Sequence, residues 1–216
     1  MFPVARSLVS SGTCIFAKLS AASLSTRLDP IRYEIFQLHD MKPVYHALNR
    51  MDVSANNSKL ALSVSCSALQ GIGKTQEVCE SLIRQGFNVT PHIASSLVID
   101  LRHTVRLANW MNSNNIQEVM VIGGDFGAPH HYPSAISFMA DLLDQQCGIT
   151  KLSFAGYPQE LPAHCTNASD MISIMLDKQT LCQQYGVEGD VVNQICLDSK
   201  KIIDWIRKLR EHGFIL

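Results

Sequence analysis

SVSCSALQGIGKTQEVCESLIRQG, residues 63–86, runs from a short apolar segment through a glycine-containing turn into a helical pattern. In the helical part Val78 and Leu82 share one face, and Gly86 provides a stop. The turn closes with the Gly-Lys-Thr of a P-loop, but Ala68 stands where the first glycine of that motif belongs. The stretch therefore predicts a strand, a turn and a helix, with P-loop nucleotide binding as the weaker alternative.

The same alternation continues through most of the chain. Apolar runs suited to strands occupy residues 33–36, 60–66, 88–94, 118–122, 152–155 and 191–197. Helical periodicity occupies residues 75–85, 98–111, 134–145, 168–184 and 199–212. Strands that alternate with helices predict βα units around a parallel sheet, either doubly wound or closed as a (β/α)8 barrel.

The two ends of the chain differ from this pattern. Residues 1–28 are basic and rich in serine, with no acidic residue before Asp29, which favours a mitochondrial transit peptide over a disordered leader of a cytoplasmic protein. The last residues, GFIL at 213–216, resemble the start of a further strand. Because a barrel typically has about 250 residues, a barrel formed by residues 29–216 would be incomplete, with six to seven strands.

Composition excludes several classes of protein. The formal net charge of -1 gives no reason to expect nucleic acid as a partner. No apolar run approaches the roughly 18 residues of a membrane span. The seven cysteines form no C-x-x-C pair and no metal-ligand spacing, so we expect reduced thiols and no bound metal.

Polar residues stand at the expected carboxyl end of each strand, which is the edge where parallel α/β folds bind ligands. They are Glu34, Ser65, His92, Asp125, Tyr157 and Gln194. Partial burial of Glu34 at such an edge would raise its pKa and make it a proton donor near neutral pH, whereas a salt bridge would make it purely structural. His92 is either a ligand contact or a hydrogen-bonded core histidine.

The segments YEIF, SVSCSA, PHIAS, MVIGGD, AGYPQELP and NQICLD carry these residues, in an order and spacing that resemble the methylenetetrahydrofolate reductase family. The resemblance extends over about residues 30–216. It implies a βα barrel that binds FAD and reduces 5,10-methylenetetrahydrofolate to 5-methyltetrahydrofolate with NADH or NADPH. A non-catalytic folate- or flavin-binding relative is the alternative.

The resemblance also implies roles for single residues. Glu34 would be the general acid, and Asp125 would act beside flavin and folate. The expected FAD contacts are Ser65, His92, Gly124, Asp125, Tyr157, Asp170 and Lys178, and the expected folate contacts are Gln194 and Asp125. The expected partner is a small folate, with no nucleic acid and no membrane, and a homo-oligomer is possible.

Overall fold

The computed structural model describes residues 14–16, 32–50, 60–123, 131–159 and 167–216. Its strands form one seven-stranded sheet whose spatial order is the chain order. Strands β2 to β7 are parallel, and β1 pairs antiparallel with β2. The strands are β1 Cys14–Phe16, β2 Arg32–Ile35, β3 Ala61–Val64, β4 Asn88–Ala94, β5 Glu118–Ile122, β6 Lys151–Gly156 and β7 Glu188–Asn193.

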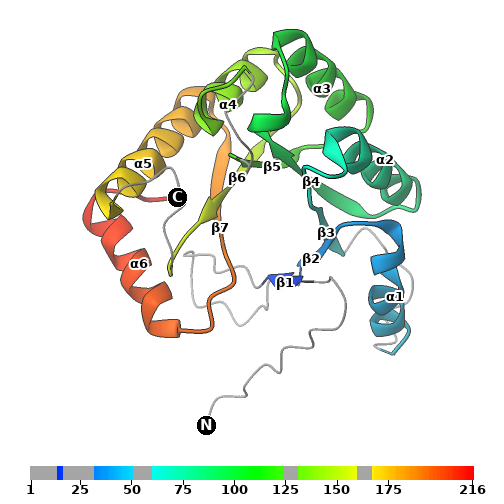
Figure 1. The fold of residues 1–216 in the computed structure, drawn as a ribbon, viewed down its shortest axis with the longest axis horizontal. Coiled ribbons are helices and arrows are strands. Elements are labelled where there is room, and N and C mark those ends of the chain that lie inside the picture. Colours follow the sequence, from blue (N-terminus) through cyan, green and yellow to red (C-terminus); the bar gives the residue numbers. More distant parts are fainter. Residues whose placement is uncertain (1–13, 17–31, 51–59, 124–130, 160–166) are drawn as a thin grey trace.

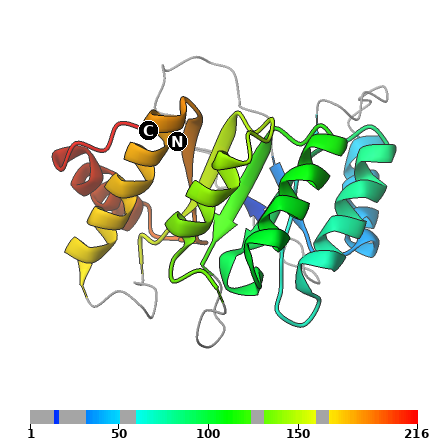
Figure 2. The same ribbon diagram turned by 90° about the horizontal axis from the view of Figure 1, so that it is seen from above.

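Helices follow the parallel strands along the chain and cover the convex face of the sheet. They are α1 Met41–Arg50, α2 Gly71–Arg84, α3 Leu101–Ser113, α4 Ala135–Asp144, α5 Ala168–Tyr185 and α6 Ser199–Glu211, with short 3-10 turns at Leu38–Asp40 and Ser95–Leu97. Figure 1 shows these helices on the outside of an arc of strands, and Figure 2 shows them running alongside the strands they cover. A doubly wound sheet reverses its strand order, whereas this order never reverses. The fold is a curled, open α/β sheet that is compatible with an incomplete (β/α)8 barrel.

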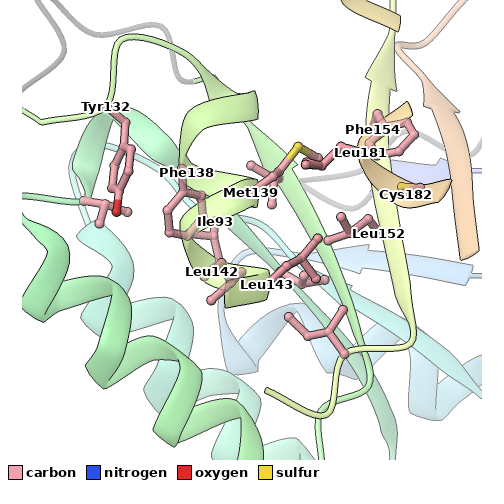
Figure 3. Close-up of a cluster of buried hydrophobic side chains, with 14 of the residues drawn as sticks. Ile93, Tyr132, Phe138, Met139, Leu142, Leu143, Leu152, Phe154, Leu181 and Cys182 are labelled. Atoms are coloured by element: carbon pink, nitrogen blue, oxygen red, sulfur yellow. The ribbon is translucent and has the colours of Figure 1, made fainter. Parts of the chain in front are cut away.

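The apolar core lies between the sheet and the helices. Ile93 lies there beside Phe138 and Leu142 of α4, and Phe154 lies beside Leu181 and Cys182 of α5 (Figure 3). A second cluster joins the first strands to the first helices; it is formed by Ile35, Met41, Val44, Leu62, Val64, Val78, Cys79, Leu82, Phe87 and Val89. Because side chains alternate between the two faces of a strand, the remaining strand residues face the concave side. No helix in the described ranges is long and apolar enough to span a bilayer.

Most predicted elements are confirmed, with small shifts at their ends. Strands β4 and β5 have the predicted bounds, and the five predicted helices are all present. β7 begins at Glu188, three residues before the predicted start at Val191, because its charged residues are part of the sheet. The apolar residues Ile195 and Leu197 follow β7 and are 56% and 90% exposed.

Three parts of the fold differ from the prediction. Helix α1 was not predicted, and it contains Pro43 in its first turn, where proline is tolerated. Residues 14–16 of the predicted leader form β1, whose backbone pairs with β2 in the register Cys14 to Glu34. The end of the chain is not a strand. There the side chain of Gln179 on α5 accepts hydrogen bonds from the amides of Ile215 and Leu216 at 2.6 and 3.3 Å.

Candidate active site

The concave face of the sheet is polar along several neighbouring strands. The strand registers align Glu34 with Ser63 and Thr90, and align Glu118 with Lys151. In barrels of this class the interior is usually filled by bulky branched residues. Here the alternate positions that face inward include Arg32, Glu34, Ser63, Ser65, Thr90, His92, Glu118, Lys151, Ser153 and Asp190.

A charged layer lies near the amino-terminal ends of the strands. Nη1 and Nη2 of Arg32 donate to Oε1 and Oε2 of Glu118 at 2.6 and 2.8 Å. The hydroxyl of Ser153 donates to the same carboxylate at 3.1 Å. On the next strands Nζ of Lys151 lies 3.1 Å from a carboxylate oxygen of Asp190. Burial alone would raise the pKa of Glu118, but Arg32 and Lys151 outweigh burial and hold that pKa below its ordinary value.

A second polar cluster lies two residues farther along the strands, toward their carboxyl ends. It consists of Glu34 in β2, Ser65 directly after β3 and His92 in β4, and all three are buried. The hydroxyl of Ser65 donates a short hydrogen bond to Oε1 of Glu34. The same hydroxyl lies 3.4 Å from Nδ1 of His92, and Nδ1 lies 3.6 Å from Oε1 of Glu34. Three consecutive strands thus bring an acid, a hydroxyl and an imidazole together.

Burial favours the uncharged forms of the acid and of the imidazole. It raises the pKa of Glu34, and the hydrogen bond from Ser65 opposes this rise only in part. Burial, reinforced by the positive charge of Arg32, lowers the pKa of His92 to about 4. Although the separation of Glu34 and His92 would suit an ion pair, His92 is therefore neutral near pH 7. The contact joins hydrogen-bonding groups and not opposite charges.

The pairing of Arg32 explains why Glu34 has no cationic partner in this cluster. Arg32 lies two residues before Glu34 on the same strand and the same face, but its guanidinium is held by both oxygens of Glu118. The salt-bridge alternative for Glu34 is thus not what the described residues form. No group of three or more His, Cys, Asp or Glu side chains suited to a metal occurs among them either.

The other predicted site residues lie elsewhere. Tyr157 follows β6 and is half-buried, and Gln194 follows β7 and is exposed. Asp170 forms a capping box with Asn167 at the start of α5. Lys178 lies over the ring of Phe154, 5.5 Å from its centroid, between the sheet and α5 and thus away from the concave face. Gly124 and Asp125 lie outside the described residues.

This placement bears on the predicted cofactors. Ser65 and His92 contact Glu34, whereas Lys178 lies on the opposite face of the sheet. The described residues predicted to hold FAD do not form one surface, so they do not fit that group as a set. FAD and a nicotinamide reductant stay predictions.

The turn before α2 does not have the features of a P-loop. The amides of Gln70 and Gly71 donate to the carbonyl of Ser67 at 3.2 and 2.8 Å, so they close a turn. The ammonium of Lys74 lies 2.7 Å from the carboxylate of Glu77 on the outside of the helix. The stretch 63–86 is a strand, a turn and a helix, as its sequence predicts, and the P-loop alternative is not supported.

Comparison with known proteins gives no family for this chain. No protein-family model matches it, and no curated protein matches it. One similar solved structure is a GH128 (subgroup III) curdlan-specific exo-beta-1,3-glucanase from Blastomyces gilchristii in complex with glucose. The two chains are 15% identical, the match covers 74% of this chain and 70% of that chain, and the TM-score is 0.42. A similarity of this size carries no argument about activity.

These comparisons overturn the assignment to the methylenetetrahydrofolate reductase family. A member over residues 30–216 should match a family model or a curated relative, and the chain matches neither. The predicted folate reductase activity, which rested on this family assignment, is therefore also wrong. The six segments that carried the resemblance are short, and each covers the end of a strand. Small and polar residues gather at such ends in many parallel βα folds, so the segments reflect the architecture and not the family.

The sequence contained a further pattern that would have found the concave face. Polar residues recur with a period of two at the starts of several strands, as in Arg32 with Glu34, Lys151 with Ser153, and Glu188 with Asp190. A search for apolar runs passes over these residues. Period-two polarity inside otherwise buried strands marks a face that is lined by polar groups.

Proposed function

We propose that this protein is an acid–base catalyst that acts on a small polar molecule at the carboxyl edge of its curled sheet. Glu34 supplies and takes back the proton. The observation that carries the proposal is the cluster of Glu34, Ser65 and His92, because it holds a buried carboxyl group among neutral hydrogen-bonding partners. We also propose that the curled sheet is part of a (β/α)8 barrel.

The protonation of Glu34 supports this role. A general acid works best when its pKa lies near the working pH, and burial shifts the pKa of Glu34 upward in that direction. A structural glutamate in a protein interior is normally paired with a cation. In this site the nearby cation, Arg32, is paired with Glu118. The arrangement leaves Glu34 without a cation that would favour its ionised form.

The position of Glu34 supports the role as well. It lies next to the last residue of β2, at the edge where parallel α/β folds bind their ligands. Its side chain is buried but retains 11% of its exposure, so one part of it faces the surface. A ligand whose reacting atom becomes more basic during the reaction, such as a leaving-group oxygen or a carbonyl oxygen, is the kind that this acid would serve.

Two measurements test the proposal. Infrared difference spectroscopy of the wild type against Glu34→Gln should show the C=O stretch of a protonated carboxyl group at neutral pH. Labelling with dicyclohexylcarbodiimide, which attacks protonated carboxyl groups, followed by peptide mapping should modify Glu34. Glu77, which is exposed and forms a salt bridge with Lys74, is the comparison that should stay unmodified. A carboxylate spectrum for Glu34 at neutral pH, or an unlabelled Glu34, would overturn the proposal.

A further inference from the structure

We propose that Glu34, Ser65 and His92 form a proton relay, in which the proton of Glu34 leaves and returns through Nε2 of His92. The inference rests on the proposed function of Glu34 and adds the route that its proton takes. Ser65 and His92 were predicted as flavin contacts. The structure places both of them against the acid.

The relay follows from the connectivity of the three side chains. The Ser65 hydroxyl contacts both of the other groups, with a short hydrogen bond to Oε1 of Glu34 and a distance of 3.4 Å to Nδ1 of His92. A hydroxyl both donates and accepts, so it can connect an acid to an imidazole in either direction. A serine bonded to the acid alone would have no such second contact.

The backbone around Ser65 fixes this hydroxyl in place. Its amide donates to the carbonyl of Ile35 at 2.9 Å, which ties it to the end of β2. Its carbonyl accepts from the hydroxyl of Thr75 on α2 at 3.3 Å. The linking residue is thus held from the strand on one side and from the helix behind it. A relay needs this kind of preorganised position, because each proton hop requires hydrogen-bond distance.

The transfer can be written with all protons accounted for. In the structure the Ser65 hydroxyl donates to Oε1 of Glu34. In the first state of the proposed cycle Glu34 carries its proton and the hydroxyl has turned, so that it accepts from Glu34 and donates to Nδ1 of His92, while Nε2 carries the imidazole proton. The Nε2 proton then passes to the ligand or to water, the Ser65 proton moves to Nδ1, and the Glu34 proton moves to Ser65. One proton has left, Glu34 is a carboxylate, and His92 is neutral with its proton on Nδ1.

The return path is the reverse of this step and completes the cycle. A proton that arrives at Nε2 releases the proton on Nδ1 to Ser65, and Ser65 passes its own proton to the carboxylate of Glu34. His92 is neutral at both ends of the cycle, which agrees with a pKa of about 4. Within the described part of the chain Nε2 has no hydrogen-bond partner, so the proton would enter and leave the relay at this atom.

The relay makes a prediction that a merely structural cluster does not make. The tautomer of His92 must change from Nε2–H to Nδ1–H as Glu34 loses its proton. We would follow Glu34 by its infrared C=O band, and the His92 ring nitrogens by 15N NMR of the full chain, with the His92 signals assigned by their loss in His92→Gln. The expected result is one shared midpoint for both titrations.

Variants separate the relay from simple proximity. Ser65→Ala removes the linking hydroxyl and should uncouple the His92 tautomer from the titration of Glu34, while Ser65→Thr, which retains a hydroxyl, should restore the coupling. Ser153→Ala is the matched control, because Ser153 faces the same side of the sheet but bonds Glu118. A His92 tautomer that stays constant while Glu34 titrates, or a coupling that survives Ser65→Ala, would overturn the relay. A Glu34 already ionised at neutral pH would instead overturn the proposed function.

Discussion

Arg32 and Glu118 form a two-armed ion pair across the concave face, although β3 and β4 lie between their strands in the sheet. Neighbouring strands lie about 4.8 Å apart, so a flat sheet would hold these two positions roughly 14 Å apart. The contact therefore requires the sheet to curl. An ion pair on the inner face joins the first parallel strand to the fourth, while the apolar clusters lie outside.

Replacing Arg32 by alanine should destabilise the protein by about 3 kcal/mol, because it leaves the carboxylate of Glu118 without its main partner in a poorly solvated position. Both side chains of the pair are less than one fifth exposed, at 16% and 17%. The free energy of unfolding from urea denaturation measures the effect. Ser153 and Lys151 still support Glu118, so complete unfolding is not expected.

Arg84→Ala provides the matched control for this variant. Arg84 faces Glu80 at 3.8 Å on the surface of α2, and its side chain is 70% exposed. Surface pairs of this kind contribute roughly 0.5 kcal/mol or less. Equal effects of the two substitutions would show that the inner pair does not hold the sheet in its curled form.

The packing of the outer face of this fold could be predicted from the sequence, whereas the pairing of charges on the inner face could not. Apolar periodicity locates β4, β5 and α6 because their buried sides pack against other layers of the protein. It misplaces the start of β7, where Glu188 and Asp190 are strand residues that pair with Lys151. Charge inside a strand becomes favourable only when its partners are brought in from distant strands, and local sequence does not contain that information.

In the candidate site, too, the positions of the residues could be predicted from the sequence but their contacts could not. Glu34, Ser65 and His92 were predicted from their positions at strand ends, because parallel strands place those ends at one edge. Their direct contact could not be predicted, since it depends on the curl of the sheet and on the register of three strands. The ion pair of Arg32 with Glu118, which leaves Glu34 among neutral groups, also depends on the tertiary structure and could not be predicted from the sequence.

Gln179 holds the end of the chain against α5, and its loss should be costly. Its amide nitrogen donates to the carbonyl of Gly213 at 3.1 Å, and its carbonyl oxygen accepts from two backbone amides of the last two residues. Gln179→Ala leaves these partly buried backbone groups without partners, so we expect a loss of about 2 kcal/mol. Hydrogen exchange should show faster exchange of the amides of Ile215 and Leu216 in the variant.

Gln183→Ala on the same helix is the control, because Gln183 is exposed. Its effect on the free energy of unfolding should be within about 0.5 kcal/mol, and the exchange of the last two amides should not change. If Gln179→Ala behaved like this control, the tail would be held by its other contacts, which include the packing of Phe214 and Leu216 and the hydrogen bonds from Arg210 to their carbonyls.

Glu34 should make the protein less stable as the pH rises. Its pKa is raised in the native state, so the native state binds this proton more tightly than the unfolded chain does. The stabilisation is fully present below the unfolded pKa of about 4.3 and is lost as the pH rises through the raised native pKa. Glutamine cannot ionise, so Glu34→Gln should gain stability relative to the wild type across that range, as measured by urea unfolding at several pH values.

The control for this pH effect is Glu77→Gln on the surface of α2, where the side chain is 68% exposed. Substitutions at exposed positions usually change the free energy of unfolding by no more than about 0.5 kcal/mol, so this variant should stay close to the wild type. A difference between Glu34→Gln and the wild type that does not change with pH would mean that Glu34 has the same pKa in the native and unfolded states.

His92 should have the opposite effect on stability: it should make the protein less stable as the pH falls. Its native pKa of about 4 lies below the unfolded value of about 6.5, so the unfolded chain takes up the proton first as the pH falls. The stabilisation is complete above about pH 6.5 and is lost toward pH 4, by an amount on the order of 3 kcal/mol. His92→Gln should therefore become more stable relative to the wild type as the pH falls through this window. Urea unfolding at intervals across the window measures the variant and the wild type, and a difference between them that does not change with pH would show that His92 is not held neutral by the fold.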